Sequence, residues 1–174
     1  MLQEFSDWLT QTDLNAFLSD TTHIETWLII PVSQSIHIMA VAVVMICVAV
    51  LNLRLLGFAG GHRSFAQMAA RLMPWVWGGL IALFATGVIQ TMAEPGREIL
   101  NISFQIKLVL LVIVAAITVF YQRALKKDPA YWENSPEHRR MGQLLASVSL
   151  VLWIGIAVAG RLIAYLDMRS ENIS

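Results

Sequence analysis

Apolar residues in this sequence form four long uncharged runs and do not alternate with polar residues. The runs cover residues 31–51, 72–93, 108–122 and 141–160. A helix of about 20 apolar residues spans the ~30 Å hydrocarbon layer of a bilayer. The third run is short and needs residues 102–107 to complete a span. The pattern predicts an all-α, four-helix transmembrane bundle with spans at about 31–53, 72–93, 102–122 and 141–166.

A different pattern precedes the first run, because apolar and polar residues mix there at helical spacing. Phe5, Trp8 and Leu9 recur on one helical face, and a similar apolar set follows between residues 14 and 18. The sequence therefore predicts an amphipathic periplasmic helix lying over one end of the bundle. The expected organisation is an amphipathic segment at 1–26, the bundle at 27–166 and a periplasmic tail at 167–174.

Composition agrees with a protein that has little surface in water. Hydrophobic residues make up 57% of the chain and charged residues 14%, whereas soluble domains carry about 25% charged residues. The formal net charge is zero, which argues against a nucleic-acid partner. The lipid bilayer is the expected main partner.

The basic residues indicate the orientation of the bundle. Eight of the twelve follow the first or third predicted span, namely Arg54, Arg63, Arg71, Arg123, Lys126, Lys127, Arg139 and Arg140. Loops rich in lysine and arginine remain in the cytoplasm. We therefore expect a multi-pass protein of the bacterial inner membrane, with both termini in the periplasm.

Each predicted span carries a polar residue in its periplasmic half, while the cytoplasmic halves carry almost none. The four residues are His37, Gln90, Lys107 and Arg161, and Tyr165 follows Arg161 by one turn. Polar residues within membrane helices are costly and commonly mark functional sites. The common depth predicts that they converge on one site near the periplasmic surface.

One interpretation of this site is a haem b centre in a small electron-transfer protein with a membrane redox partner. A neutral imidazole ligates metals, so His37 would be the axial ligand and the metal-binding residue. Arg161 and Lys107 would balance the propionates, with Gln90 and Tyr165 as hydrogen-bond donors. A second ligand is missing from the spans, and His23 could supply it from the periplasmic side.

Other interpretations use the same residues without a redox group. His37 would then form a hydrogen bond across the bundle, and Lys107 and Arg161 would extend to the interface or bind a carboxylate, a lipid headgroup or a quinone carbonyl. The protein would be a non-redox scaffold, a subunit or a small-anion or lipid-binding bundle. Transport is a weaker alternative because no broken helix pair is visible.

Enzymatic activity is uncertain, because no known catalytic motif is present. Small residues do occur on the second and fourth spans, where they permit close helix packing and a possible homo-oligomer. They include Gly78, Gly79, Gly87, Gly155 and Gly160.

Several short motifs together resemble a family of bacterial four-helix inner-membrane proteins of unknown function. They are Ser35-Ile36-His37, NLRLLG at 52–57, LMPWVW at 72–77, FQIK at 104–107 and AGRLI at 159–163. The resemblance implies the same architecture and no established activity.

The chain departs from that family at Gln34 and Asn52, where an acidic residue is frequent. A proton-relay role at these two positions is therefore not expected. A more distant likeness to copper-resistance membrane domains and b-type cytochromes favours a haem or a metal, by analogy of architecture alone.

Overall fold

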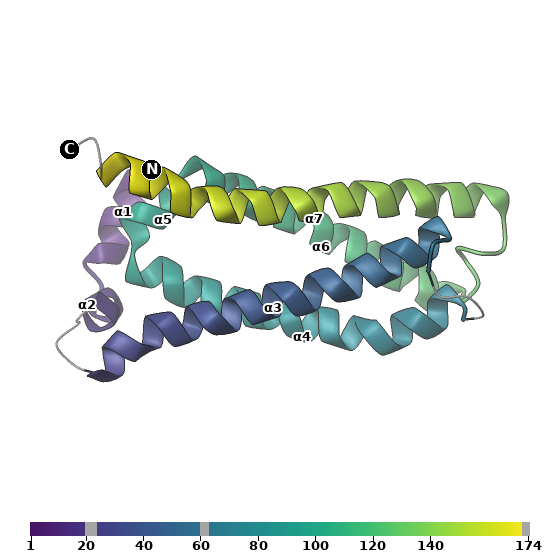
Figure 1. The fold of residues 1–174 in the computed structure, drawn as a ribbon, viewed down its shortest axis with the longest axis horizontal. Coiled ribbons are helices and arrows are strands. Elements are labelled where there is room, and N and C mark those ends of the chain that lie inside the picture. The colour runs from purple at the N-terminus through teal and green to yellow at the C-terminus, as the bar shows by residue number, and fades with distance from the viewer. Residues whose placement is uncertain (20–23, 60–62, 172–174) are drawn as a thin grey trace.

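Long helices run side by side along the molecule, and short helices lie across one of its ends (Figure 1). The computed structural model describes residues 1–19, 24–59 and 63–171, with the backbone alone for residues 24–27, 97 and 161–171. The helices are α1 (Leu2–Thr10), α2 (Asp13–Ser19), α3 (Ile24–Leu56), α4 (Phe65–Ala93), α5 (Pro95–Ile99), α6 (Ile102–Lys127) and α7 (Pro136–Glu171).

The predicted all-α bundle with four long apolar helices is confirmed. Within the described residues, four helices are long and apolar enough to cross a membrane, at Leu28–Leu56, Phe65–Ala93, Ile102–Lys127 and Pro136–Gly160. Large apolar side chains remain exposed on their outward faces, for example Ile81, Val112 and Val151. Such apolar faces are favourable in contact with the acyl chains of a bilayer and unfavourable in contact with water.

Helix α4 begins seven residues before the span predicted at 72–93, because its start is capped. The Ser64 side chain accepts a hydrogen bond from the Gln67 N–H at 3.2 Å. The Gln67 side chain in turn accepts from the Ser64 N–H at 3.3 Å. This reciprocal capping box satisfies backbone donors that the first helical turn leaves free. Hydropathy alone places the start of the span later, because residues 64–71 include Arg71.

The long helices do not pack equally against each other. Helix α3 packs along α4 and α7, and α6 packs along α7, whereas α4 and α6 make few close backbone contacts. We call the boundary between α4 and α6 the α4–α6 seam. Buried apolar residues such as Val44, Val76, Val114 and Trp153 fill the centre of the bundle. A second apolar cluster, which includes Phe65 and Trp132, lies where the α3–α4 and α6–α7 connections meet.

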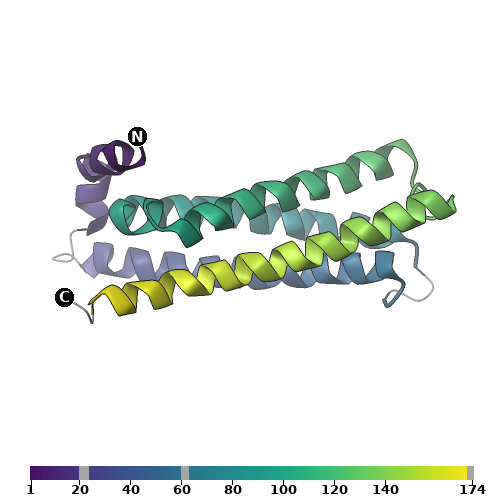
Figure 2. The same ribbon diagram turned by 90° about the horizontal axis from the view of Figure 1, so that it is seen from above.

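The two ends of the bundle differ. Helices α1, α2 and α5 lie at one end, together with the last turns of α7, and we call this the capped end (Figure 2). The α3–α4 and α6–α7 connections lie at the opposite end, the loop end. The Asn15 amide of α2 donates to the carbonyl oxygen of Met92 at 2.8 Å, which attaches the short helices to the end of α4.

The N-terminal helices turn only part of their apolar surface inward. Leu9 and Leu18 are buried, whereas Phe5, Trp8 and Phe17 are about half exposed. The Phe5 and Trp8 rings stack with their centroids 6.0 Å apart. Exposed aromatic rings at the end of a membrane bundle are typical of the membrane–water interface.

Candidate functional site

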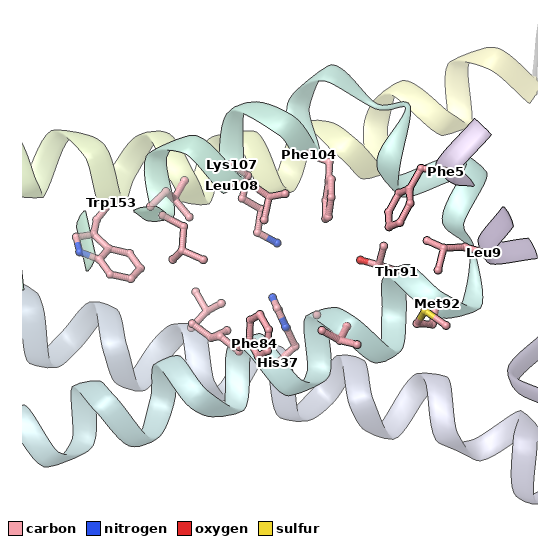
Figure 3. Close-up of a pocket in the computed structure, with 16 residues that line it drawn as sticks. Phe5, Leu9, His37, Phe84, Thr91, Met92, Phe104, Lys107, Leu108 and Trp153 are labelled. Carbon is pink, nitrogen blue, oxygen red and sulfur yellow. The ribbon is translucent and has the colours of Figure 1, made fainter. Parts of the chain in front are cut away.

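A cavity of about 290 Å³ lies inside the bundle near the capped end (Figure 3). Residues of α1, α3, α4, α6 and α7 form its walls, so every long helix contributes to it. Its lining is mostly apolar and comprises Phe5, Leu9, His37, Val41, Leu83, Phe84, Gly87, Val88, Thr91, Met92, Phe104, Lys107, Leu108, Leu111, Trp153 and Ile156.

A second cavity of about 350 Å³ adjoins the first on the side of α3 and α7. Both cavities share one set of wall residues, namely His37, Val41, Gly87, Thr91, Phe104, Lys107 and Ile156. The second cavity adds the polar side chains of Gln34, Gln90 and Glu98. The apolar space therefore meets the polar groups at His37 and Lys107.

His37 is held in place by Thr86 of the neighbouring helix α4. Its Nδ1 atom lies 2.8 Å from Oγ1 of Thr86, which is a hydrogen-bond distance. The Thr86 hydroxyl also donates to the carbonyl oxygen of Ala82 at 2.6 Å. The Ser33 hydroxyl of α3 donates to the carbonyl oxygen of Thr86 at 3.4 Å. The imidazole therefore has a defined orientation, with its Nε2 edge turned away from Thr86.

Lys107 of α6 faces His37 from across the cavity, and the two side chains point toward one another (Figure 3). The side chain is partly buried. Glu98 lines the second cavity and interacts electrostatically with Lys107. This carboxylate balances the positive charge that Lys107 brings into the bundle.

Gln90 adds an unused donor to the same region. Its Nε2 atom is buried and has no hydrogen-bond partner among the described residues. Gln90 lies one turn beyond Thr86 on α4, which brings both side chains to the same face of that helix. A polar atom of a bound molecule would satisfy this donor.

The structure brings together three of the residues that the sequence singled out. His37, Gln90 and Lys107 all line the second cavity. The side chains of Arg161 and Tyr165 lie outside the described residues, although the backbone of α7 continues through both positions. His23 also lies outside the described residues.

The two histidines in the described part of the chain lie far apart. His138 lies at the loop end, where its ring stacks on that of Tyr131 with centroids 4.1 Å apart. Among the described residues, no group of three or more His, Cys, Asp or Glu side chains is placed to hold a metal ion. His37 is thus the one described histidine that lines either of the two cavities.

Some contributors to this site were not anticipated from the sequence. Thr86 precedes Gln90 by four residues, so the sequence indicates that both side chains lie on the same face of α4. It does not indicate that Thr86 contacts His37, because that contact depends on how α3 and α4 pack. Glu98 lies on α5, a helix too short to show a periodic pattern. Phe5 and Leu9 reach the cavity because α1 folds across the capped end.

A second polar cluster lies in the half of the bundle that was expected to have almost no polar groups. Asn52 is 0% exposed, and its Nδ2 atom donates to Oγ of Ser149 at 3.0 Å. The Tyr121 hydroxyl lies 3.5 Å from Oδ1 of Asn52. These contacts join α3, α6 and α7, so that expectation was wrong. The cluster resembles polar contacts that fasten membrane helices to each other.

Comparison with known proteins gives the chain a family but no activity. No match is found among the curated proteins or the solved structures. The family of unknown function DUF6644 matches residues 8–166, which is most of the chain. The expected resemblance to a family of unknown function is confirmed. The chain belongs to DUF6644.

Proposed function

We propose that this protein binds a small amphipathic molecule inside its bundle, with the apolar part in the first cavity and the polar head at His37 and Lys107. One observation carries the proposal: a largely apolar cavity has a small group of oriented polar side chains partway along its wall (Figure 3). Binding sites for small molecules commonly combine apolar walls with a few placed polar groups. The cavity size, about 290 Å³, is at the lower end of the range for such sites.

In this proposal the ligand enters from the bilayer through the α4–α6 seam. Phe84, Val88 and Leu108 of α4 and α6 line the first cavity and are nevertheless exposed, Phe84 to 73%. The mouth of the cavity therefore opens on a face that lipid would cover. An apolar molecule dissolved in the membrane reaches this mouth without crossing water.

The proposal places the capped end at the periplasmic surface of a bacterial inner membrane. Support comes from the basic residues, which gather in the connections at the loop end. Positive charge of this kind remains on the cytoplasmic side. The head group of the ligand would then lie just below the periplasmic surface.

Haem b with a role in electron transfer remains a second candidate, and the orientation of His37 favours it. A histidine that ligates a metal commonly donates its other ring N–H to a nearby oxygen, and Nδ1 of His37 lies 2.8 Å from such an oxygen, Oγ1 of Thr86. Lys107 faces this ring from across the cavity, and Arg161 and Tyr165 are the further residues expected from the sequence. The described residues supply one histidine at the cavity, so a second protein ligand would come from His23 or from another chain.

Fluorescence quenching tests the binding proposal, because Trp153 lines the first cavity and is 3% exposed. A brominated long-chain alcohol quenches tryptophan on contact. We expect saturable quenching in detergent-purified protein that disappears in Trp153→Phe. Trp75→Phe is the matched control, because Trp75 is 64% exposed. Quenching of Trp75 itself would rise without saturation, so Trp75→Phe should keep the saturable quenching that comes from Trp153. Non-saturable quenching that is equal in both variants would contradict the proposal.

The visible absorption spectrum tests the haem candidate. Purified protein would show a Soret band that shifts on addition of dithionite and is lost in His37→Ala. A colourless preparation from cells supplied with haem precursor would eliminate this candidate and leave the first proposal standing.

A further inference from the structure

We infer that the polar head bound between His37 and Lys107 is a hydroxyl group, which donates to Nε2 of His37 and accepts from Lys107. This inference rests on the proposed function and specifies the chemical class of its ligand. The members of this class are molecules with an apolar tail and a neutral O–H head, such as phenols, hydroquinones and protonated fatty acids.

The first step concerns the proton of the Thr86 hydroxyl. Oγ1 of Thr86 lies 2.6 Å from the carbonyl oxygen of Ala82, a distance at which two oxygens must share a proton. The carbonyl has no proton to give, so Thr86 is the donor. A hydroxyl has one proton. Toward His37, Thr86 can therefore offer only a lone pair.

The second step fixes the tautomer of His37. Nδ1 lies 2.8 Å from Thr86 Oγ1 and must supply the proton of that hydrogen bond. In a neutral imidazole one nitrogen is a donor and the other an acceptor. Nε2 of neutral His37 is therefore an acceptor, and no described residue donates to it. The hydrogen bond of one ring nitrogen sets the role of the other.

The third step concerns Lys107, which lies opposite His37 across the cavity. Lys107 only donates hydrogen bonds, so the head must accept from Lys107 and donate to His37. A hydroxyl oxygen does both. An ether, an ester or a ketone accepts from Lys107 but leaves the Nε2 lone pair without a donor.

The charge of the site favours a neutral head over an anion. Glu98 already interacts with Lys107, so the cavity does not require a negative ligand to balance the lysine. A carboxylate head would also face Glu98 across the same cavity. Gln90, whose Nε2 lacks a described partner, can donate to a second oxygen of the head.

Matched pairs of ligands test this inference by competition, in which each compound displaces the brominated alcohol and so relieves the quenching of Trp153 in the fluorescence assay described above. One pair is a long-chain alkylphenol and its methyl ether, and the other is a fatty acid at a pH where it is protonated and its methyl ester. In each pair the hydroxyl form is expected to bind about tenfold more tightly, since one unmade hydrogen bond to a buried group costs about that factor. Of the phenol and the fatty acid, the one that binds more tightly is the better model of the natural head group.

Thr86→Val provides the decisive variant. Valine has the shape of threonine but cannot accept from Nδ1, so His37 is free to hold its proton on Nε2 and donate to the ligand. The preference should then fall to about twofold or reverse toward the methyl ether. Thr118→Val is the matched control, because Thr118 makes the same bond to a carbonyl one turn earlier, at 2.8 Å to Val114. The control should retain the tenfold preference.

The outcomes separate this inference from the proposed function. Equal saturable binding within both pairs, or a tenfold preference retained in Thr86→Val, would overturn the inference and leave the binding function intact. Failure of all four compounds to bind saturably would overturn both. Nitrogen-15 NMR of histidine-labelled wild-type protein, with the His37 signals assigned by their loss in His37→Ala, gives an answer that does not depend on Thr86→Val. A protonated Nδ1 with an unprotonated Nε2 at His37 supports the inference, and a protonated Nε2 on neutral His37 contradicts it.

Discussion

Gly79 of α4 packs directly against Val44 of α3. A Cβ atom placed on Gly79 would overlap the Val44 side chain and lie 3.6 Å from the carbonyl oxygen of Ala40. Val44 itself is completely buried. Small residues allow membrane helices to approach in this way. The contact holds α3 against α4, and those two helices carry His37 and Thr86.

Gly79→Ala is expected to destabilise the bundle. The added methyl group meets a packed side chain and backbone, and overpacking of this kind costs about 1–3 kcal/mol. Gly78→Ala is the matched control, because a Cβ atom on Gly78 meets nothing within 4 Å. Unfolding in increasing sodium dodecyl sulfate, followed by circular dichroism, measures both variants. Equal stability of the two would show that the α3–α4 contact is not tight.

Asn52→Ala is expected to weaken the bundle at the loop end. The substitution removes the hydrogen bond to Ser149 and leaves that buried hydroxyl without this donor. Polar contacts between membrane helices contribute about 0.6 kcal/mol on average and rarely more than about 1.7 kcal/mol. A double-mutant cycle with Ser149→Ala measures the coupling directly. Strictly additive effects of the two substitutions would mean that the contact contributes nothing to stability.

Labelling from outside the cell tests the proposed orientation. Glu4 lies at the capped end and Glu137 at the loop end, and both are exposed. In a Cys47→Ala background, a membrane-impermeant maleimide should label Glu4→Cys in intact spheroplasts. It should label Glu137→Cys only after the membrane is opened. The reverse labelling pattern would show that the loop end faces the periplasm and would contradict the proposed orientation. It would not contradict the fold.

The sequence predicted the long helices because each is a continuous apolar run, a signal that depends on no other part of the chain. It also predicted that His37, Gln90 and Lys107 share one region, because depth within a span can be counted along a helix. What could not be predicted was the pairing between helices. The bond from His37 to Thr86 and that from Asn52 to Ser149 depend on the rotation of each helix about its own axis.

The cavity itself was also beyond the reach of sequence patterns. It exists because α4 and α6 make little contact and because α1 brings Phe5 and Leu9 across the capped end. Neither feature leaves a periodic signal, since both follow from how whole helices pack. Glu98 reaches the site in the same way, because its proximity to Lys107 arises from the short helix α5.

Saturable binding of the brominated alcohol to Gly87→Leu tests the central claim most directly. Gly87 lines both cavities, and a Cβ atom there would lie 3.9 Å from Cε1 of His37, so a leucine side chain fills the space beside the imidazole. Gly78→Leu adds the same side chain where nothing lies within 4 Å. We predict that saturable quenching of Trp153 is lost in Gly87→Leu and kept in Gly78→Leu, with both variants folded by circular dichroism. Undiminished saturable quenching in Gly87→Leu would contradict ligand binding in this cavity.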